Sequence, residues 1–431
     1  MKMKRGNKLL AFLAVFALIL SACGDGEEGG ETTTTEGGTD TTMATGDLGT
    51  ISYEAGEPIK IASLQAISGD NASLGTDQVR AVELAVEDFG QIEGHDVEIA
   101  FQEDDLCSSE GGQTGATRII ADPQVVAVVG TSCSGAGVPA SRIVSEAGRV
   151  LISGSNTSPV LTSDLAGNPG PEYHEGYFRT AHNDAIQGAA AATFVFEELG
   201  LTKVATINDG DPYTQGLTSA FESFFEGLGG EIVLSTAVTS DQTDMRPVLT
   251  EIAAAGAELV FFPIFQPAAD FIAEQAQDTS GLEDVVLMGA DGLLSDTFVV
   301  LPQSEGMYFS GPSTPTTPAY EEFVTAYEAA YGEPPIQAFH AHAYDATMML
   351  LTAVQNVAEV DGDTVTVDLQ AVRDELHELS YDGLTGTLSC DEYGDCASPA
   401  IDIVRNTEET ETIEEVRENV LTTYTREDLG L

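Results

Sequence analysis

The sequence predicts an α/β protein of two lobes, each built on a doubly wound parallel β-sheet. The 431 residues exceed what one ordinary hydrophobic core contains, so two domains are expected. From residue 58 onward, stretches with the apolar pattern of strands alternate with stretches that have the pattern of helices. A turn-rich segment, 164–176, interrupts this alternation, which then starts again. Such alternation is typical of parallel sheets with helices on both faces.

In the first half, residues 125–130 form a continuous apolar run of the kind that buried parallel strands show. Residues 97–101 alternate as in a half-buried strand, whereas apolar residues in 79–89 recur at helical spacing. The expected strands are 58–64, 97–101, 125–130 and 150–153, and the expected helices are 79–89, 111–120 and 137–147.

The second half repeats the pattern without repeating the sequence. The expected strands are 203–208, 231–234, 259–265 and 285–288, and the expected helices are 184–199, 214–227, 244–255, 267–277, 318–331, 338–358 and a Glu-rich helix at 409–419. Residues 386–396 are expected to form a hairpin. We expect the N-terminal lobe to comprise 57–179 and 310–399, and the C-terminal lobe 180–309 and 400–431.

The first 22 residues have the features of an export signal. Four basic residues precede an apolar run, 9–20, that is too short to span a bilayer comfortably. The ending Leu20-Ser21-Ala22-Cys23 resembles the lipobox of bacterial lipoproteins, which implies a lipid on Cys23 after removal of residues 1–22. A plain secretory signal or a short membrane anchor are the alternatives. Residues 23–56 are acidic and rich in Thr and Gly, so we expect a disordered tether.

The charge of the chain excludes some partners. Its formal net charge is -55, from 71 acidic and 16 basic side chains. Nucleic acid needs a basic face, and anionic lipid head groups attract basic segments. We therefore expect no nucleic-acid partner, and membrane contact through the lipid at Cys23 alone.

The four remaining cysteines allow three pairings, and an exported protein tends to pair them. Cys390 and Cys396 flank a turn-like segment and most simply pair with each other, which leaves Cys107 with Cys133. Neither pair has the Cys-x-x-Cys spacing of a zinc or redox site. No metal or cofactor is expected.

The segments that follow the strands predict the ligand. Ligands of open α/β sheets bind beyond the carboxyl ends of the strands. Hydroxyls and glycines are frequent after residues 129 and 152, and acidic residues follow 207 and 288. Hydroxyls and a helix N-terminus suit a carboxylate, whereas a cluster of acceptors with one acid suits an ammonium group. Together they indicate a site for an α-amino acid.

The sequence resembles the leucine/isoleucine/valine-binding proteins, which are type I periplasmic binding proteins of ABC transporters. The resemblance covers about 57–400 and is densest in 104–162. The matching stretches are Ile59-Lys60-Ile61-Ala62, Asp104-Asp105-Leu106-Cys107, Val128-Val129-Gly130-Thr131-Ser132-Cys133-Ser134, Leu151-Ile152-Ser153 and Thr157-Ser158-Pro159-Val160-Leu161-Thr162. The resemblance implies two lobes joined by a hinge of several crossings, a monomer on the outer face of the cytoplasmic membrane, and a separate membrane permease as partner.

Residue by residue, the resemblance implies roles for four positions of the N-terminal lobe. Ser134 matches the serine that holds the ligand carboxylate, and Thr157 the threonine that touches both carboxylate and ammonium. Asn156 matches a position whose backbone carbonyl contacts the ammonium. Leu74 stands where branched-chain binders place an aromatic residue, a departure that leaves the side-chain preference open. The resemblance also implies the Cys107–Cys133 disulfide.

In the C-terminal lobe, Tyr213 matches the aromatic residue at the ligand, and Asp291 matches the acid that pairs with the ammonium, where the family usually has Glu. A ligand that bridges the lobes would favour their closed arrangement. Each assignment has a structural alternative: Ser134 or Asp291 as a cap, Thr157 or Tyr213 as a turn residue, and Leu74 as packing.

Other functions are also open. A sensor component, or a binder of an amide, urea or a small carboxylate, would have the same lobes. A hydrolase is disfavoured, because Gly130-Thr131-Ser132-Cys133-Ser134 departs from Gly-x-Ser-x-Gly and no histidine follows a strand in a suitable pattern. We expect a binding protein and not an enzyme.

Overall fold

The computed structural model describes residues 48–397 and 399–431. The expected signal peptide 1–22, the lipidation site Cys23 and most of the expected tether lie outside the described residues. Within the described part of the chain, no helix is both long and apolar enough to cross a membrane.

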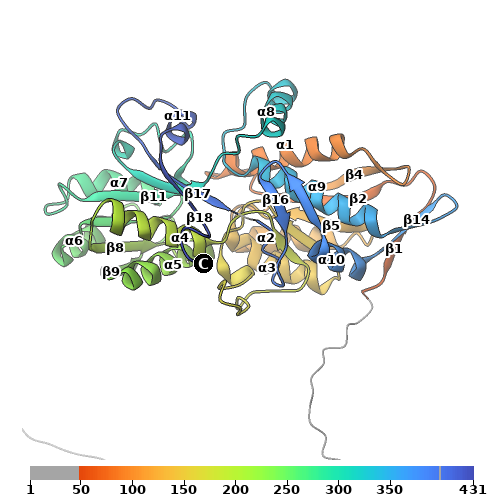
Figure 1. The fold of residues 1–431 in the computed structure, drawn as a ribbon, viewed down its shortest axis with the longest axis horizontal. Coiled ribbons are helices and arrows are strands. Elements are labelled where there is room, and N and C mark those ends of the chain that lie inside the picture. Colours follow the sequence, from red (N-terminus) through yellow and green to blue (C-terminus); the bar gives the residue numbers. More distant parts are fainter. Residues whose placement is uncertain (1–47, 398) are drawn as a thin grey trace, which may run out of the picture. The chain divides into compact units, whose positions relative to one another are not determined.

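The N-terminal lobe is built on a six-stranded sheet of order β3-β4-β2-β5-β6-β7 (Figure 1). Its pairs are parallel except for the short antiparallel pair β3–β4. The strands are β2 (Ile59–Gln65), β3 (Gln91–Ile92), β4 (His95–Asp104), β5 (Val125–Gly130), β6 (Val150–Ser153) and β7 (Tyr177–Arg179).

Helices cover both faces of this sheet, as doubly wound folds require. Alternate side chains of β2 show the two faces: Ile59 and Ile61 pack with α9, whereas Ala62 and Leu64 pack with α2 and α3. The helices of this lobe are α1 (Ala72–Phe89), α2 (Ser109–Ile120), α3 (Ser134–Glu146), α8 (Pro318–Tyr331), α9 (His340–Val357) and α10 (Leu369–Glu378).

The C-terminal lobe is built on a seven-stranded sheet of order β18-β17-β12-β11-β10-β8-β9. The strands are β8 (Lys203–Asn208), β9 (Glu231–Ala237), β10 (Leu259–Phe261), β11 (Val286–Ala290), β12 (Tyr308–Pro312), β17 (Ala400–Arg405) and β18 (Val420–Thr425). The pairs β12–β17 and β17–β18 are antiparallel, and the others are parallel.

Two layers of helices flank this second sheet as well (Figure 1). Val204 and Leu259 face the core with α4 and α5, and Ala205 and Val260 face the core with α6 and α7. The helices are α4 (Asp184–Thr193), continued by a π-turn at Phe194–Glu198, α5 (Pro212–Leu228), α6 (Arg246–Ala255), α7 (Ala268–Gln277) and α11 (Ile413–Glu418). The predicted architecture of two doubly wound lobes is confirmed, with antiparallel edges as an addition.

The chain passes between the sheets after β7, after β12 and before β17. These three crossings form the hinge between the lobes. The expected lobe boundary at residue 310 falls inside β12, so the strand that ends at Pro312 belongs wholly to the C-terminal lobe.

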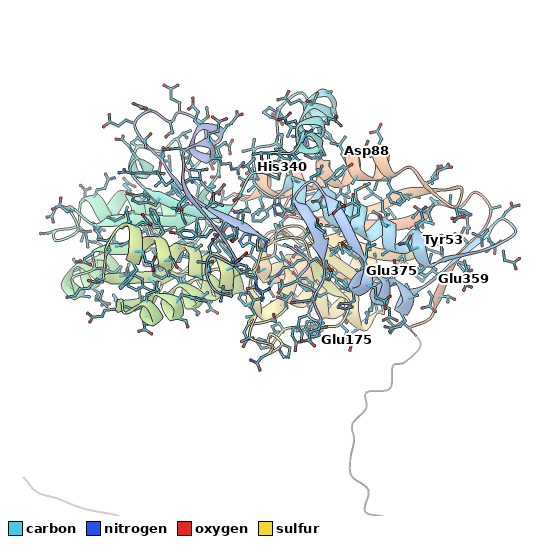
Figure 2. The ribbon with its side chains drawn as sticks, viewed as in Figure 1. Tyr53, Asp88, Glu175, His340, Glu359 and Glu375 are labelled. Carbon is cyan, nitrogen blue, oxygen red and sulfur yellow. A yellow bond between two sulfur atoms is a disulfide. The ribbon has the colours of Figure 1, made fainter. Side chains whose placement is uncertain are left out.

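The prediction that residues 23–56 form a disordered tether is wrong for the last residues of this range. Thr50–Tyr53 form β1, which pairs with β14 (Thr364–Asp368) in a small sheet that also contains β13 (Ala358–Asp361). Tyr53, labelled in Figure 2, is buried together with Ile51, and its hydroxyl donates to Gln124 O at 2.7 Å. Composition hid this strand, because two alternating apolar side chains suffice when a partner strand completes the sheet.

Some element boundaries also differ from expectation. Helix α3 begins at Ser134 and not at 137, so it includes Gly135 and Gly137. The apolar run 259–265 is strand only as far as Phe261, because Pro263 follows two residues later and has no backbone N–H to donate to the ladder. The Glu-rich helix is shorter than 409–419 and comprises Ile413–Glu418.

The segment 386–396 is not a complete hairpin. β16 (Gly386–Ser389) pairs with β15 (Ser380–Gly383), which lies before the expected segment. The Cys390–Cys396 disulfide closes the loop that follows, and a second disulfide joins Cys107 to Cys133. Both expected pairings are therefore present.

Candidate ligand-binding cleft

A narrow cavity lies between the carboxyl ends of the strands of the two lobes. The structure brings Leu74, Ser134, Thr157, Tyr213 and Asp291 together in its wall, although they come from distant parts of the sequence. Convergence at this place follows from the fold, because both sheets present the carboxyl ends of their parallel strands to the cleft.

Ser134 is the first residue of α3 and contributes a hydroxyl and a helix N-terminus to the cleft. Its Oγ accepts from the backbone N–H groups of Thr157 and Ser158, both at 3.3 Å, so its own O–H remains to be donated. The positive end of a helix of 13 residues favours an anion at this point.

Asn156 does not reach the cavity. Its side chain is buried behind the wall, where it donates to Thr131 O at 2.8 Å and accepts from the Tyr177 hydroxyl at 3.2 Å. Its backbone carbonyl accepts from Arg179 Nη1 at 3.1 Å. The carbonyl that the resemblance implied for a ligand ammonium is thus already hydrogen-bonded within the protein, to Arg179.

On the opposite wall, the Tyr213 hydroxyl donates to Asp291 Oδ1 at 3.1 Å, and Gln187 Nε2 donates to the same oxygen at 2.6 Å. Burial raises the pKa of Asp291 to about 6, and these two hydrogen bonds oppose the shift. Gly292 N–H donates to the Tyr213 hydroxyl at 3.3 Å. Asp291 is therefore an oriented carboxylate that is shielded from solvent, and such a carboxylate favours a cationic partner.

Asp184 is a carboxylate that the sequence analysis missed. It is the first residue of α4, it is fully buried, and neither of its oxygens has a well-formed hydrogen bond among the described residues. Its backbone N–H donates to Thr157 O at 2.9 Å, which places it directly behind the cleft wall. Burial and the charge of Asp291 raise the pKa of Asp184, and the nearby Thr157 hydroxyl opposes this. No periodic or motif signal marked it, because it resembles an ordinary first-turn acid.

Behind Asp291, a short polar chain leads into the protein. Gln187 Oε1 lies 2.5 Å from His182 Nε2, and burial lowers the pKa of His182 to about 3. The imidazole is neutral at physiological pH and donates from Nε2. This donation orients the Gln187 amide so that its NH₂ group points to Asp291.

The lobes touch at the edge of the cleft. Ser158 Oγ donates to Pro212 O at 2.7 Å, and an added Cβ at Gly135 would lie 2.0 Å from Asp211 Oδ2. Burial raises the pKa of Asp211 to about 6, and the Gly135 N–H is among the hydrogen bonds that oppose this. Gly135 permits this approach because it has no Cβ.

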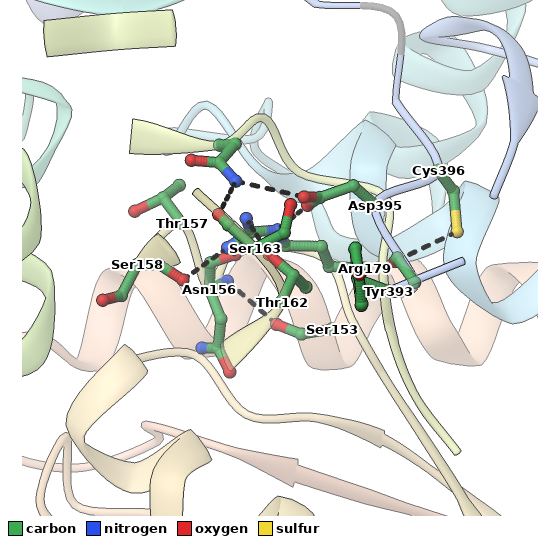
Figure 3. A network of polar contacts seen from close by, with 12 residues as sticks. Ser153, Asn156, Thr157, Ser158, Thr162, Ser163, Arg179, Tyr393, Asp395 and Cys396 are labelled. Carbon is green, nitrogen blue, oxygen red and sulfur yellow. Dashed lines mark hydrogen bonds and ion pairs between the residues drawn. The ribbon is translucent and has the colours of Figure 1, made fainter. Parts of the chain in front are cut away.

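Arg179 supports the cleft from the side of the hinge (Figure 3). It has no exposed surface and pairs with Asp395 at 2.5 Å. Its two Nη atoms donate to Asn156 O, to Ser158 O at 2.9 Å and to Thr162 Oγ1 at 2.6 Å. The guanidinium therefore holds both backbone neighbours of Thr157.

The site offers no chemistry for hydrolysis. The Ser132 hydroxyl is committed to Gln65 Oε1 at 2.8 Å, and no histidine lines the cavity in the described part of the chain. Residues 48–397 and 399–431 also contain no cluster of three or more side chains that could hold a metal ion. The arrangement offers a hydroxyl and a helix N-terminus for an anion on one wall and a carboxylate for a cation on the other.

The fold and cleft define a two-lobed solute-binding protein of the type I architecture. The model of the periplasmic binding protein family matches residues 58–400. The chain belongs to this family, and within it to the Leu/Ile/Val-binding type. It is an extracytoplasmic binding protein of the ABC-transporter class and not an enzyme.

Individual relatives agree with this assignment. The chain is 28% identical over 354 residues to Leu/Ile/Val-binding protein homolog 3 of Brucella melitensis, which covers 80% of this chain and 91% of the relative. The structure of the branched-chain substrate-binding protein LivJ of Streptococcus pneumoniae with isoleucine is similar at a TM-score of 0.70 and 24% identity, over 85% of this chain and 99% of that one. A solute-binding protein of Rhodopseudomonas palustris with benzoate is similar at a TM-score of 0.66 and 20% identity, over 81% and 94%.

Proposed function

We propose that this protein captures a free α-amino acid in the cleft and delivers it, in the closed form, to an ABC permease. The observation that carries the proposal is the pairing of an anion site at Ser134 with a buried carboxylate at Asp291 across one narrow cavity. An α-amino acid is the small solute whose carboxylate and ammonium match both.

The carboxylate would lie at the start of α3. There the Ser134 hydroxyl and the helix N-terminus donate, and the Thr157 hydroxyl lines the same cavity. The ammonium would lie against Asp291 and Tyr213, close to the Asp184 carboxylate. Asp291 and Tyr213 offer acceptors for its N–H groups, and Asp184 behind the wall adds negative charge.

The excess of acids speaks against a simple carboxylate as the ligand. Asp70 and Asp291 line the cavity, Asp184 and Asp211 lie close behind, and no Lys or Arg is among the described lining residues. An anion such as benzoate would enter this field without a compensating cation. An amide or urea would leave the α3 N-terminus without the anion that it favours.

Closure follows from contacts that exist in only one arrangement of the lobes. A ligand held by Ser134 and Thr157 on one lobe and by Tyr213 and Asp291 on the other stabilises the form in which all four meet. Ligand-dependent closure gives a permease a shape to recognise. A receptor that recognised the same shape would make the protein a sensor, and the cleft would work in the same way.

The binding test uses residues 48–431 and isothermal titration with the amino acids, benzoate, acetate and acetamide. We expect at least one α-amino acid to bind, and benzoate, acetate and acetamide not to bind. Asp291→Asn should lower the affinity about 100-fold, as expected for a lost charged hydrogen bond. Asp296→Asn, at an exposed aspartate nearby, is the matched control and should bind like the wild type. Tight binding of benzoate with no amino-acid binding would contradict the proposal.

We also propose that the mature protein is anchored through lipid on Cys23. The support is the Leu20-Ser21-Ala22-Cys23 motif behind an apolar run. Expression of the full chain in a bacterium with radiolabelled palmitate should label the wild type and leave Cys23→Ser unlabelled. Equal labelling of both proteins would refute the anchor without affecting the binding proposal.

A further inference from the structure

The wall of the cavity contains residues that are not assigned to the carboxylate or the ammonium group of a ligand. Beyond the residues assigned to those groups, its walls include three apolar side chains, Leu74, Phe265 and Phe339. The remaining polar residues fall into one group on each lobe. The group with unused hydrogen-bond donors and acceptors determines which ligand side chain the cavity accepts.

The polar group of the C-terminal lobe is already satisfied. Gln266 Nε2 donates to Asp270, and Gln266 Oε1 accepts from Ser295 at 3.1 Å and from Thr297 at 2.6 Å. Ser295 Oγ also accepts from Phe298 N–H at 3.1 Å. These side chains form a closed network and offer little to a ligand.

In the N-terminal lobe, the Ser132 and Ser155 hydroxyls are hydrogen-bonded, whereas other polar side chains that line the cavity have unused groups. Gln337 is 7% exposed and lines the cavity, and its Nε2 donates to Ser73 Oγ at 3.1 Å. Among the described residues, no hydrogen bond uses Gln337 Oε1, the second N–H of its amide, or the O–H of Ser73. The Asn71 amide beside them also makes no hydrogen bond within the described chain.

Gln337 is held in place by its backbone. Asp77, which is buried, accepts from Ile336 N–H at 2.7 Å and from Gln337 N–H at 2.6 Å. A fixed backbone and the bond to Ser73 orient the free carboxamide edge toward the cavity. An oriented and buried amide with unused donors and acceptors is a recognition element, because an apolar ligand would leave it unpaired.

We propose that the bound amino acid has a short, uncharged side chain that forms hydrogen bonds, a carboxamide or a hydroxyl, and that Gln337 and Ser73 recognise it. The inference rests on the proposed function. An acidic side chain lacks a cation in the described lining, and the narrow cavity disfavours a long basic one. A branched-chain side chain fits Leu74 and the aromatic walls but satisfies none of the free polar groups.

The test is isothermal titration of residues 48–431 with glutamine, asparagine, threonine, serine, leucine, isoleucine, valine, glutamate and lysine. We expect the tightest ligand to be an amide or hydroxyl amino acid, at least tenfold tighter than leucine, isoleucine or valine. Gln337→Leu and Ser73→Ala should each weaken that ligand at least tenfold. Both should change leucine binding less than threefold. Gln113→Leu, on the exposed face of α2, is the matched control and should change neither.

The outcomes separate the two proposals. Tightest binding of a branched-chain, acidic or basic amino acid overturns this inference and leaves amino-acid binding intact. Binding of no amino acid overturns the proposed function and the inference together. Gln337→Leu with an unchanged preference also overturns the inference, provided that its thermal unfolding midpoint shows a folded protein.

Discussion

Substitution of Asp395 by Asn should destabilise the protein far more than the loss of a surface ion pair. Arg179 is fully buried and Asp395 is its partner at 2.5 Å, so the change leaves a guanidinium without its counter-charge. Removal of one member of a buried pair costs about 3–5 kcal/mol. Arg179 keeps its bonds to Asn156 O, Ser158 O and Thr162 Oγ1, which places the expected loss near the lower end, about 3 kcal/mol.

The assay is urea unfolding of residues 48–431, followed by circular dichroism and fitted with a common slope. Asp244→Asn is the control, because the Arg246–Asp244 pair has side chains that are 74% and 55% exposed. Exposed pairs contribute at most about 1 kcal/mol. A difference of less than about 1 kcal/mol between the two variants would refute the argument that Arg179 depends on Asp395.

Three further predictions concern the cleft and the first disulfide. Affinity for the amino acid should fall about tenfold per pH unit below about 6, because burial raises the pKa of Asp291 to about 6 and its protonated form cannot pair with an ammonium. A dissociation constant that is unchanged between pH 4.5 and 8 would contradict this. Gly135→Ala should weaken ligand binding at least tenfold, because the new Cβ would lie 2.0 Å from Asp211 Oδ2 and would oppose the approach of the two lobes. Wild-type affinity in titration would disprove this. In the double variant Cys107→Ser, Cys133→Ser, the free energy of unfolding measured in urea should fall by about 3 kcal/mol, because the disulfide closes a loop of 26 residues. Reducing agent should then have no further effect at this site.

Much of the fold was predictable because its signals are local. The buried strand Val125–Gly130 is a continuous apolar run, and α1 shows helical spacing, so each is visible in a short window. β1 was missed, because Thr50–Tyr53 is stable only when paired with β14, more than 300 residues later. The end of β10 at Phe261 was also missed, since hydrophobicity reports burial and not extended backbone.

The candidate site was predictable in part for a related reason. Ser134, Thr157, Tyr213 and Asp291 each lie just after a strand, where the topology alone makes a ligand contact expected. Leu74, in α1 of the N-terminal lobe, also lines the cavity. Asn156 satisfies the same rule but does not line the cavity, because Arg179 engages its carbonyl from behind. Distance from a strand end does not tell which face of the loop a residue presents.

The sequence by itself determined the class of the protein: two α/β lobes, paired cysteines and polar loops at the strand ends, all of which depend on patterns within a few tens of residues. The tertiary structure decided what those loops do. It placed Asp184, whose carboxylate has no hydrogen-bond partner in the described part of the chain, behind Thr157. It also brought Gln337 to Ser73 from a segment more than 250 residues away, and set Gly135 against Asp211 across the lobes. The physical reason is that hydrogen-bond satisfaction and close approach are properties of contacts between distant segments, and no local pattern of side chains contains them.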